Sequence, residues 1–319
     1  MKRLPLAAIL FALPILGLLN AGCPAKSSNP TSPAPTPTTV PSYTMSVSFG
    51  SSGVTAMNGP AGIGLAGADI WVANETGGTF QEWTTAGVAL SQASTYNGSA
   101  TFVEPWTAAI GADGYIYVAD EGNLQVEEFT PAGTYVTAFA SAQLGTSNPR
   151  GVAVNSTYAY VVGEIVYGSY MLRYTLSGPV TGSGKTFTSP VTFGNSGTGA
   201  LGTAINVCLD ASGNVYVCDY SNNRVVKYDP SGVYQMAVTQ SLSEPRGAVV
   251  DANGNIFVSD SGTGISPVPS IHLYDPSGNL LSTLGAGTLS GCTGLALDTL
   301  GNLYAADSGH NRVVWFKKN

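Results

Sequence analysis

Four carboxylates recur at one position of a repeated pattern in this 319-residue chain and could do chemistry. Each ends a short apolar run that carries an aromatic residue; they are Asp120, Asp219, Asp260 and Asp307. Carboxylates gathered around one opening would suit a divalent cation such as calcium. An Asp that ends a strand before a turn usually accepts local backbone N–H bonds instead. We expect that structural role, and keep ligand or cation binding as the alternative.

Two arginines, Arg150 and Arg246, each follow a proline at the start of a predicted strand. Two guanidinium groups at one opening could grip a carboxylate or sulfated ligand. The alternative is that each forms a salt bridge, with neighbours such as Glu104 or Glu244. We include both arginines, with the four Asp residues, in the candidate ligand-binding set.

Catalytic and cofactor motifs give little support to an enzyme. The chain has two histidines, His272 and His310, so one chain cannot supply a three-His zinc site. Neither a G-x-S-x-G nor an H-E-x-x-H run is present. We therefore predict no catalytic residues and no cofactor, with calcium as the alternative, and lean towards a non-enzymatic protein.

Cys208 and Cys218 stand where other copies of the pattern carry small residues. The simplest expectation is two buried thiols that act as small hydrophobic groups. An exported compartment would also permit a disulfide between them, which depends on the register of the hairpin. Cys292 would then remain free.

An internal repeat must position these residues. The clearest copy, 207–232, predicts three short strands joined by turns at 211–214 and 229–232. Its second strand recurs roughly every 40–55 residues, a period typical of propeller blades, at 70–74, 116–120, 159–163, 215–219, 256–260 and 303–307. A third strand with a further aromatic follows each copy, at Trp83, Phe129, Tyr174, Tyr228, Tyr274 and Phe316. These recurring aromatics are expected to be core between blades.

Two segments resemble a known repeat family. Residues 210–228 read D-A-S-G-N-V-Y-V-C-D-Y-S-N-N-R-V-V-K-Y, and 298–316 read D-T-L-G-N-L-Y-A-A-D-S-G-H-N-R-V-V-W-F. Both closely resemble the NHL repeat, and 251–278 resembles its first half. The resemblance implies a six-bladed β-propeller. It also implies functions that range from binding scaffolds to an amidating lyase and relatives of gluconolactonases and of the streptogramin lyase.

The sixth copy stops before a fourth strand, whereas the stretch from residue 43 to 50 has no blade of its own. Residues 47–53 match 191–197, which is predicted to be a fourth strand with its exit loop. Because an unpaired outer edge would template aggregation, we expect 43–50 to complete the last blade. The predicted fold is therefore all-β: a six-bladed propeller of NHL-type repeats over 43–319, closed by its N-terminal strand.

Antiparallel strands place the start of strand one and the end of strand two at one end of every blade. That end carries the candidate arginines and aspartates and the variable loops 163–170 and 260–270, whereas short turns occupy the other end. Since function concentrates on loops held by a rigid scaffold, we expect ligands at the loop-bearing end.

The N-terminus predicts export. Residues 1–22 combine two basic residues with an apolar run, as in a signal peptide, and Ala-Gly before Cys23 resembles a bacterial lipobox. Cys23 is then the lipidated residue, and 23–42 is a disordered Pro/Ser/Thr-rich tether. We expect the protein to be lipid-anchored to the bacterial cell envelope, or secreted.

A net charge of −7 disfavours nucleic acid as a partner. The function that we expect is a monomeric binding or scaffold propeller for a protein, peptide or glycan ligand. The alternative is a metal-dependent lactonase or lyase in the central channel. Converging carboxylate, Asn or His side chains in the channel would favour the enzyme, whereas a mouth of Arg, Ser and Gly would favour the scaffold.

Overall fold

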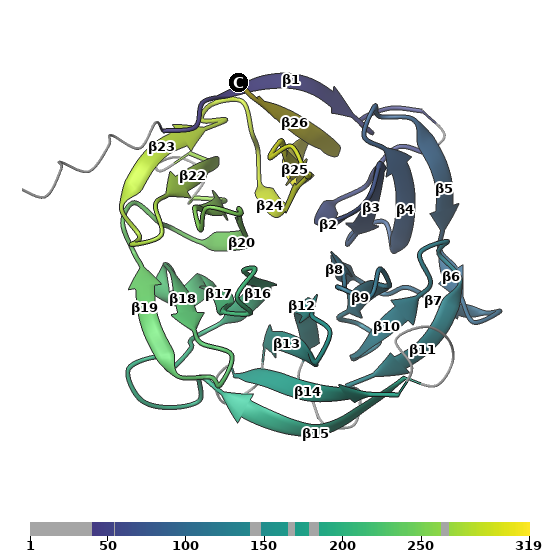
Figure 1. The fold of residues 1–319 in the computed structure, drawn as a ribbon. Helices are drawn as coiled ribbons and strands as arrows, with labels where there is room; N and C mark the ends of the chain where they lie inside the picture. Colours follow the sequence, from purple (N-terminus) through teal and green to yellow (C-terminus); the bar gives the residue numbers. More distant parts are fainter. Residues whose placement is uncertain (1–39, 54, 141–147, 165–169, 179–184, 263–267) are drawn as a thin grey trace, which may run out of the picture. The chain divides into compact units, whose positions relative to one another are not determined.

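The computed structural model describes residues 40–53, 55–140, 148–164, 170–178, 185–262 and 268–319. Within these ranges, six four-stranded antiparallel sheets are arranged as blades around a central axis (Figure 1). In every blade the first strand is innermost, and each later strand pairs with the one before it. The prediction of an all-β, six-bladed propeller is confirmed.

The first three blades are built as follows. Blade one contains β2 (Pro60–Ala66), β3 (Asp69–Asn74), β4 (Thr79–Thr84) and β5 (Ala89–Ala93). A short hairpin of β6 (Thr95–Tyr96) and β7 (Ala100–Thr101) leads to blade two. Blade two contains β8 (Pro105–Ile110), β9 (Ile116–Asp120), β10 (Gln125–Phe129) and β11 (Tyr135–Phe139). Blade three contains β12 (Asn148–Val154), β13 (Tyr158–Glu164), β14 (Met171–Ser177) and β15 (Thr186–Phe193).

The last three blades follow the same plan. Blade four contains β16 (Ala204–Leu209), β17 (Val215–Asp219), β18 (Arg224–Tyr228) and β19 (Tyr234–Val238), with the 3₁₀ helix η1 (Tyr220–Asn222) after β17. Blade five contains β20 (Pro245–Val250), β21 (Ile256–Asp260), β22 (Ser270–Tyr274) and β23 (Leu280–Leu284). Blade six contains β24 (Cys292–Leu297), β25 (Leu303–Asp307), η2 (Ser308–His310), β26 (Arg312–Lys318) and β1 (Tyr43–Phe49).

Strand β1 closes the ring. It pairs antiparallel with β26, from Tyr43 opposite Lys318 to Phe49 opposite Val313. The chain end adds to the closure, because the Asn319 N–H donates to the Ser42 carbonyl at 3.0 Å. The fourth strand of blade six therefore comes from the other end of the domain, as the missing strand after 316 predicted (Figure 1).

The recurring aromatics form the core between the blades, as predicted. Each blade contributes one from its second strand and one from its third, and none of the twelve is more than 4% exposed. Tyr117, for example, lies in one cluster with Val152 and Tyr174 of the next blade. Large apolar groups that recur at one position thus stabilise every blade–blade interface by the same burial.

The inner strands approach one another closely two residues after Pro60, Pro149, Pro245 and Cys292, which lie near the loop end of strand one. This residue is glycine in four blades: Gly62, Gly151, Gly247 and Gly294. A Cβ atom on Gly62 would lie 2.5 Å from the Cα atom of Thr107 in the next blade, and one on Gly151 would lie 2.8 Å from that of Asn206. Glycine is required here because a side chain would collide with the neighbouring backbone.

The segment 1–22, Cys23 and most of the tether lie outside the described residues. So do the middle parts of the predicted variable loops, 165–169 and 263–267. In the part of the chain that the structure describes, no helix has the length and apolarity needed to cross a bilayer.

Candidate binding site at the loop end

The four predicted aspartates lie at the loop end, where they fasten the connection that enters each blade. Each faces the first residue of strand one in its own blade. All four are at most 1% exposed, and each carboxylate accepts a backbone N–H from that connection. The bonds are Val103 to Asp120 (3.0 Å), Gly202 to Asp219 (2.8 Å), Ser243 to Asp260 (2.7 Å) and Ser290 to Asp307 (2.7 Å).

In blades four and six, an arginine side chain adds a positive charge to this arrangement. The Arg224 Nε donates to Asp219 at 2.7 Å, and the Arg312 Nε donates to Asp307 at 2.8 Å. Asp120 has no such arginine, and burial raises its pKa to about 6, against the effect of the hydrogen bonds from Asn123 and Val103. Each aspartate is thus bound within its own blade. Across the described residues, no group of three or more His, Cys, Asp and Glu side chains could hold a metal ion.

Arg150 is paired, but not with the residues that the sequence suggested. Its Nε and one terminal nitrogen donate to the two carboxylate oxygens of Glu121, both at 2.9 Å. Its guanidinium also lies 4.9 Å from the ring centroid of Trp106. The expectation of Glu104 as partner is wrong because Glu121, one residue beyond the end of β9, reaches across from the neighbouring blade. Glu121 is 5% exposed, so this pair is largely removed from water.

The Arg246 guanidinium makes fewer polar contacts than that of Arg150. Its Nε donates to the Ser261 hydroxyl at 2.7 Å, and its guanidinium lies 5.3 Å from the ring centroid of Tyr220. No described carboxylate is within ion-pair distance of it, and the suggested partner Glu244 instead accepts from the Ser261 hydroxyl at 3.3 Å. Arg246 lines a cleft of about 680 Å³ at the loop end, together with Glu244, Ser261, Ser308 and His310.

Both arginines act on one carboxylate. Burial raises the pKa of Glu75, which follows β3 in blade one, and nearby Glu121 and Glu104 raise it further. The positive charges of Arg246 and Arg150 lower the same pKa. Arg150 of blade three and Arg246 of blade five therefore both lie near enough to Glu75 of blade one to act on its charge.

The two histidines occupy different settings. His310 Nδ1 lies 2.8 Å from Asp307 Oδ2, in the place where the Asn222 amide donates to Asp219 at 2.9 Å in blade four. Its side chain is 49% exposed and lines the cleft beside Arg246. His272 is buried, with Nδ1 3.1 Å from the Thr283 hydroxyl. Sequence reasoning missed His310 as a cleft residue, although its place in the loop after Asp307 was visible.

The cysteines of the described region are free thiols. Cys208 pairs across the hairpin with Tyr216, whereas Cys218 pairs with Asn206, so the register does not place the two opposite each other. Burial raises the pKa of Cys208 to about 12. These thiols therefore pack as small apolar groups, and the disulfide alternative does not hold.

The fold is that of a six-bladed β-propeller. Residues 204–228 and 289–316 match the NHL repeat family. A curated relative, the protein brain tumor of Drosophila melanogaster, is 27% identical over 120 residues. That alignment covers 35% of this chain and 11% of the relative, so this chain matches about a tenth of that protein's length.

Solved structures of similar fold include proteins with different roles. A gluconolactonase from Xanthomonas campestris matches with a TM-score of 0.58 at 12% identity, over 82% of this chain and 87% of that one. Virginiamycin B lyase from Staphylococcus aureus gives a TM-score of 0.56 at 11% identity, over 82% and 95%. A chain of the nidogen/laminin complex gives a TM-score of 0.56 at 14% identity, over 75% and 85%. At these identities the likeness shows the shared fold.

Proposed function

We propose that this protein is a binding propeller that captures a protein or peptide ligand at its loop end, through an acidic group of that ligand. The observation that carries the proposal is the Arg246 guanidinium, which lines an open cleft beside hydroxyl groups and pairs with no described carboxylate. Arginine binds carboxylates through two parallel N–H bonds, and the Tyr220 ring holds the guanidinium plane in place.

The surroundings of Arg246 fit the recognition of a mixed-charge surface. Ser261, Ser308 and His310 add polar side chains along the same cleft, while Glu244 supplies an acceptor. The ion pair between Arg150 and Glu121 adds further polar side chains around the channel mouth. Proteins with NHL repeats commonly mediate protein interactions, and the matched repeats support this class of function.

The competing proposal is a metal-dependent lactonase or lyase with its site in the channel. This proposal is suggested by the fold that the chain shares with the gluconolactonase and virginiamycin B lyase structures. It needs converging oxygen or nitrogen ligands, and the described residues offer no group of three or more His, Cys, Asp and Glu that could hold a metal. The residues around Arg246 favour binding.

The test uses an array of acidic peptides with amide-substituted copies, probed alongside a glycan array. Removing a charged hydrogen-bonded contact costs about 1.5–3 kcal/mol, so Arg246→Ala should weaken capture of acidic peptides by roughly 10- to 100-fold. Ser212→Ala and Ser277→Ala change turns at the other end and serve as matched controls. Capture that survives Arg246→Ala, or that fails only in the turn variants, would contradict the proposal. Capture of glycans without any capture of peptides would show that the ligand is a glycan and not a peptide.

Arg150 is tested separately because its loss affects the fold. Arg150→Ala removes the cation from the buried Glu121 carboxylate, so it should lower the melting temperature as well as any binding. The double change of Arg150 and Arg246 therefore needs a melting control before lost binding is assigned to the site.

We further propose that the propeller is exported and lipid-anchored through Cys23, on the strength of the signal-like segment before it. Cys23→Ala should move the protein from the detergent phase to the soluble exported fraction. Unchanged partition into detergent would show that the anchor lies elsewhere.

A further inference from the structure

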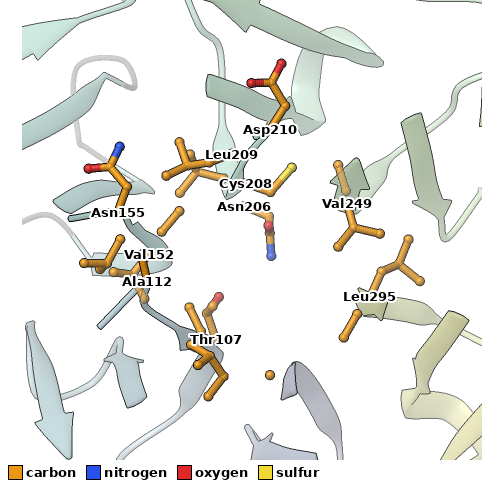
Figure 2. Close-up of a pocket in the computed structure, with 18 of the residues that line it drawn as sticks. Thr107, Ala112, Val152, Asn155, Asn206, Cys208, Leu209, Asp210, Val249 and Leu295 are labelled. Carbon is orange, nitrogen blue, oxygen red and sulfur yellow. The ribbon is translucent and has the colours of Figure 1, made fainter. Parts of the chain in front are cut away.

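The side chains of the inner strands differ in character between the two ends of the channel. Near the loop end, the residue directly before the inner-strand glycine is Arg150 in blade three and Arg246 in blade five. Towards the turn end the same strands carry aliphatic residues, and these line a cavity of about 730 Å³ (Figure 2). The cavity lies opposite the loop-end cleft, and none of its lining residues is nearer the loop end than Gly62, Thr107, Asn206 and Gly294.

The aliphatic side chains around this cavity are incompletely covered. Leu65, Ile110, Leu209, Val249 and Leu297 each come from a different inner strand and are only partly buried. Ile63 and Val207 also line the cavity, but their side chains are buried. Each of these five also packs against a blade–blade cluster, and the exposed part that remains favours contact with an apolar part of an occupant, since that contact removes their surface from water.

Two amides line this cavity, those of Asn155 and Asn206. Asn206 takes the position that glycine occupies in four other blades, and its side chain points into the cavity (Figure 2). Within the described part of the chain, no hydrogen bond joins the Asn206 side chain to another residue, whereas the Thr107 hydroxyl, which also lines the cavity, donates to the Arg150 carbonyl. An amide offers both a donor and an acceptor, so it can bind one polar group of an otherwise apolar ligand.

The rim limits the charge of that ligand. Asp210 lies at the cavity mouth, and its nearest cation is Lys227 Nζ at 3.9 Å. A carboxylate ligand would meet this negative charge, whereas a neutral carbonyl group would not. The volume falls within the range of about 300–1,000 Å³ that small-molecule sites occupy.

We propose that the turn end of the channel is a second binding site, which takes a neutral aliphatic molecule with a single amide or ester carbonyl. The aliphatic part fills the ring of Leu65, Ile110, Leu209, Val249 and Leu297, and the Asn206 amide bonds the carbonyl. This site is separate from the loop-end cleft of the proposed function, and it contains none of that cleft's residues.

The experiment titrates octanamide into protein carrying ¹³C-labelled Ile, Leu and Val methyl groups. We expect saturable shifts confined to methyl groups around the cavity, including those of Leu65, Ile110 and Leu209. Asn206→Leu should weaken octanamide binding about tenfold, by loss of one hydrogen bond, and should leave binding of octane-like apolar probes in place. Leu209→Arg should abolish both, with Val249→Arg as a second blocking variant if the first melts early.

Arg246→Ala is the matched control, because it lies at the other mouth and should leave octanamide binding unchanged. Loss of acidic-peptide capture with octanamide binding intact would separate the two sites. The proposal is overturned if octanamide gives no saturable shift, if the shifted methyl groups lie outside the cavity, or if a well-folded Leu209→Arg or Val249→Arg variant binds as the wild type does.

Discussion

Glu127 in β10 is a carboxylate placed where its charge is poorly compensated. Its side chain is fully buried, and Gln125 Nε2 donates to Oε1 at 3.0 Å, whereas Oε2 is buried without a hydrogen-bond partner among the described residues. Burial raises the pKa of Glu127 to about 8, with a further contribution from the nearby Asp120 carboxylate. The folded protein therefore holds a proton on Glu127 at pH values where the unfolded chain has lost it.

The sign of the effect follows from the two pKa values. The unfolded value is 4.5 and the folded value is about 8, so the folded state binds more protons between them. Stability must then fall as pH rises from about 4.5 to 8, with the full loss present above that window and none below it. Each unit of difference corresponds to about 1.4 kcal/mol, which limits the loss from this group to about 5 kcal/mol. Asp120, whose pKa is raised to about 6, acts with the same sign at lower pH.

The assay is chemical unfolding at pH 5 and pH 8.5, for the wild type and for Glu127→Gln. The glutamine keeps the size of the side chain and cannot ionise. We expect the variant to be more stable than the wild type by a few kcal/mol at pH 8.5, and nearly equal to it at pH 5. An equal dependence on pH in both proteins, or a variant less stable at pH 8.5, would refute the reasoning.

The next residue provides a matched control. Glu128 is equally buried, but it contacts Lys185 Nζ, which also lies 2.5 Å from Asp113 Oδ2. Glu128→Gln removes a charge that is compensated, so it should lower stability at pH 8.5. Two adjacent buried carboxylates should thus respond to the same substitution with opposite signs.

Two further predictions concern the ring. Removing 43–50 takes away β1 and exposes the edge of β26, so the variant that begins at Ser51 should melt at a lower temperature or aggregate; unchanged melting and solubility would show that closure contributes nothing. Gly62→Ala should lower the free energy of unfolding in urea by about 1–3 kcal/mol, because its Cβ atom would meet the Thr107 backbone; a variant as stable as the wild type would mean that the inner strands can separate at no cost.

The blade pattern could be predicted because its causes are local. In the turns after strand one, Asp210 Oδ1 accepts the N–H of Ser212 and of Asn214, both at 2.9 Å, and the same pair of bonds recurs at Asp251 and Asp298. Alternating apolar residues and such turns are visible in one copy of the repeat. The closing strand was also predictable, because one blade lacked a strand and one stretch lacked a blade.

Side-chain partners between blades could not be predicted in the same way. Arg150 meets Glu121 of the preceding blade, and Lys185, just before β15, meets Asp113 and Glu128 of blade two. These contacts join residues 29 to 72 positions apart in the chain. They depend on the rotation of one blade against the next, which the repeat pattern does not encode. The burial of Glu127 without a compensating cation also depends on how the blades are rotated against one another.

The two channel mouths follow from different positions of one strand. The residue before the inner-strand glycine or its equivalent lies near the loop end and varies between Arg150, Arg246 and the apolar Ile205, whereas the residues near the other end of strand one stay aliphatic. The glycine in four of the blades lets the inner strands meet between these positions, so a change at one mouth need not disturb the other. If the two proposed sites are correct, a substitution at this position should change binding at the loop end and leave the cavity at the turn end intact.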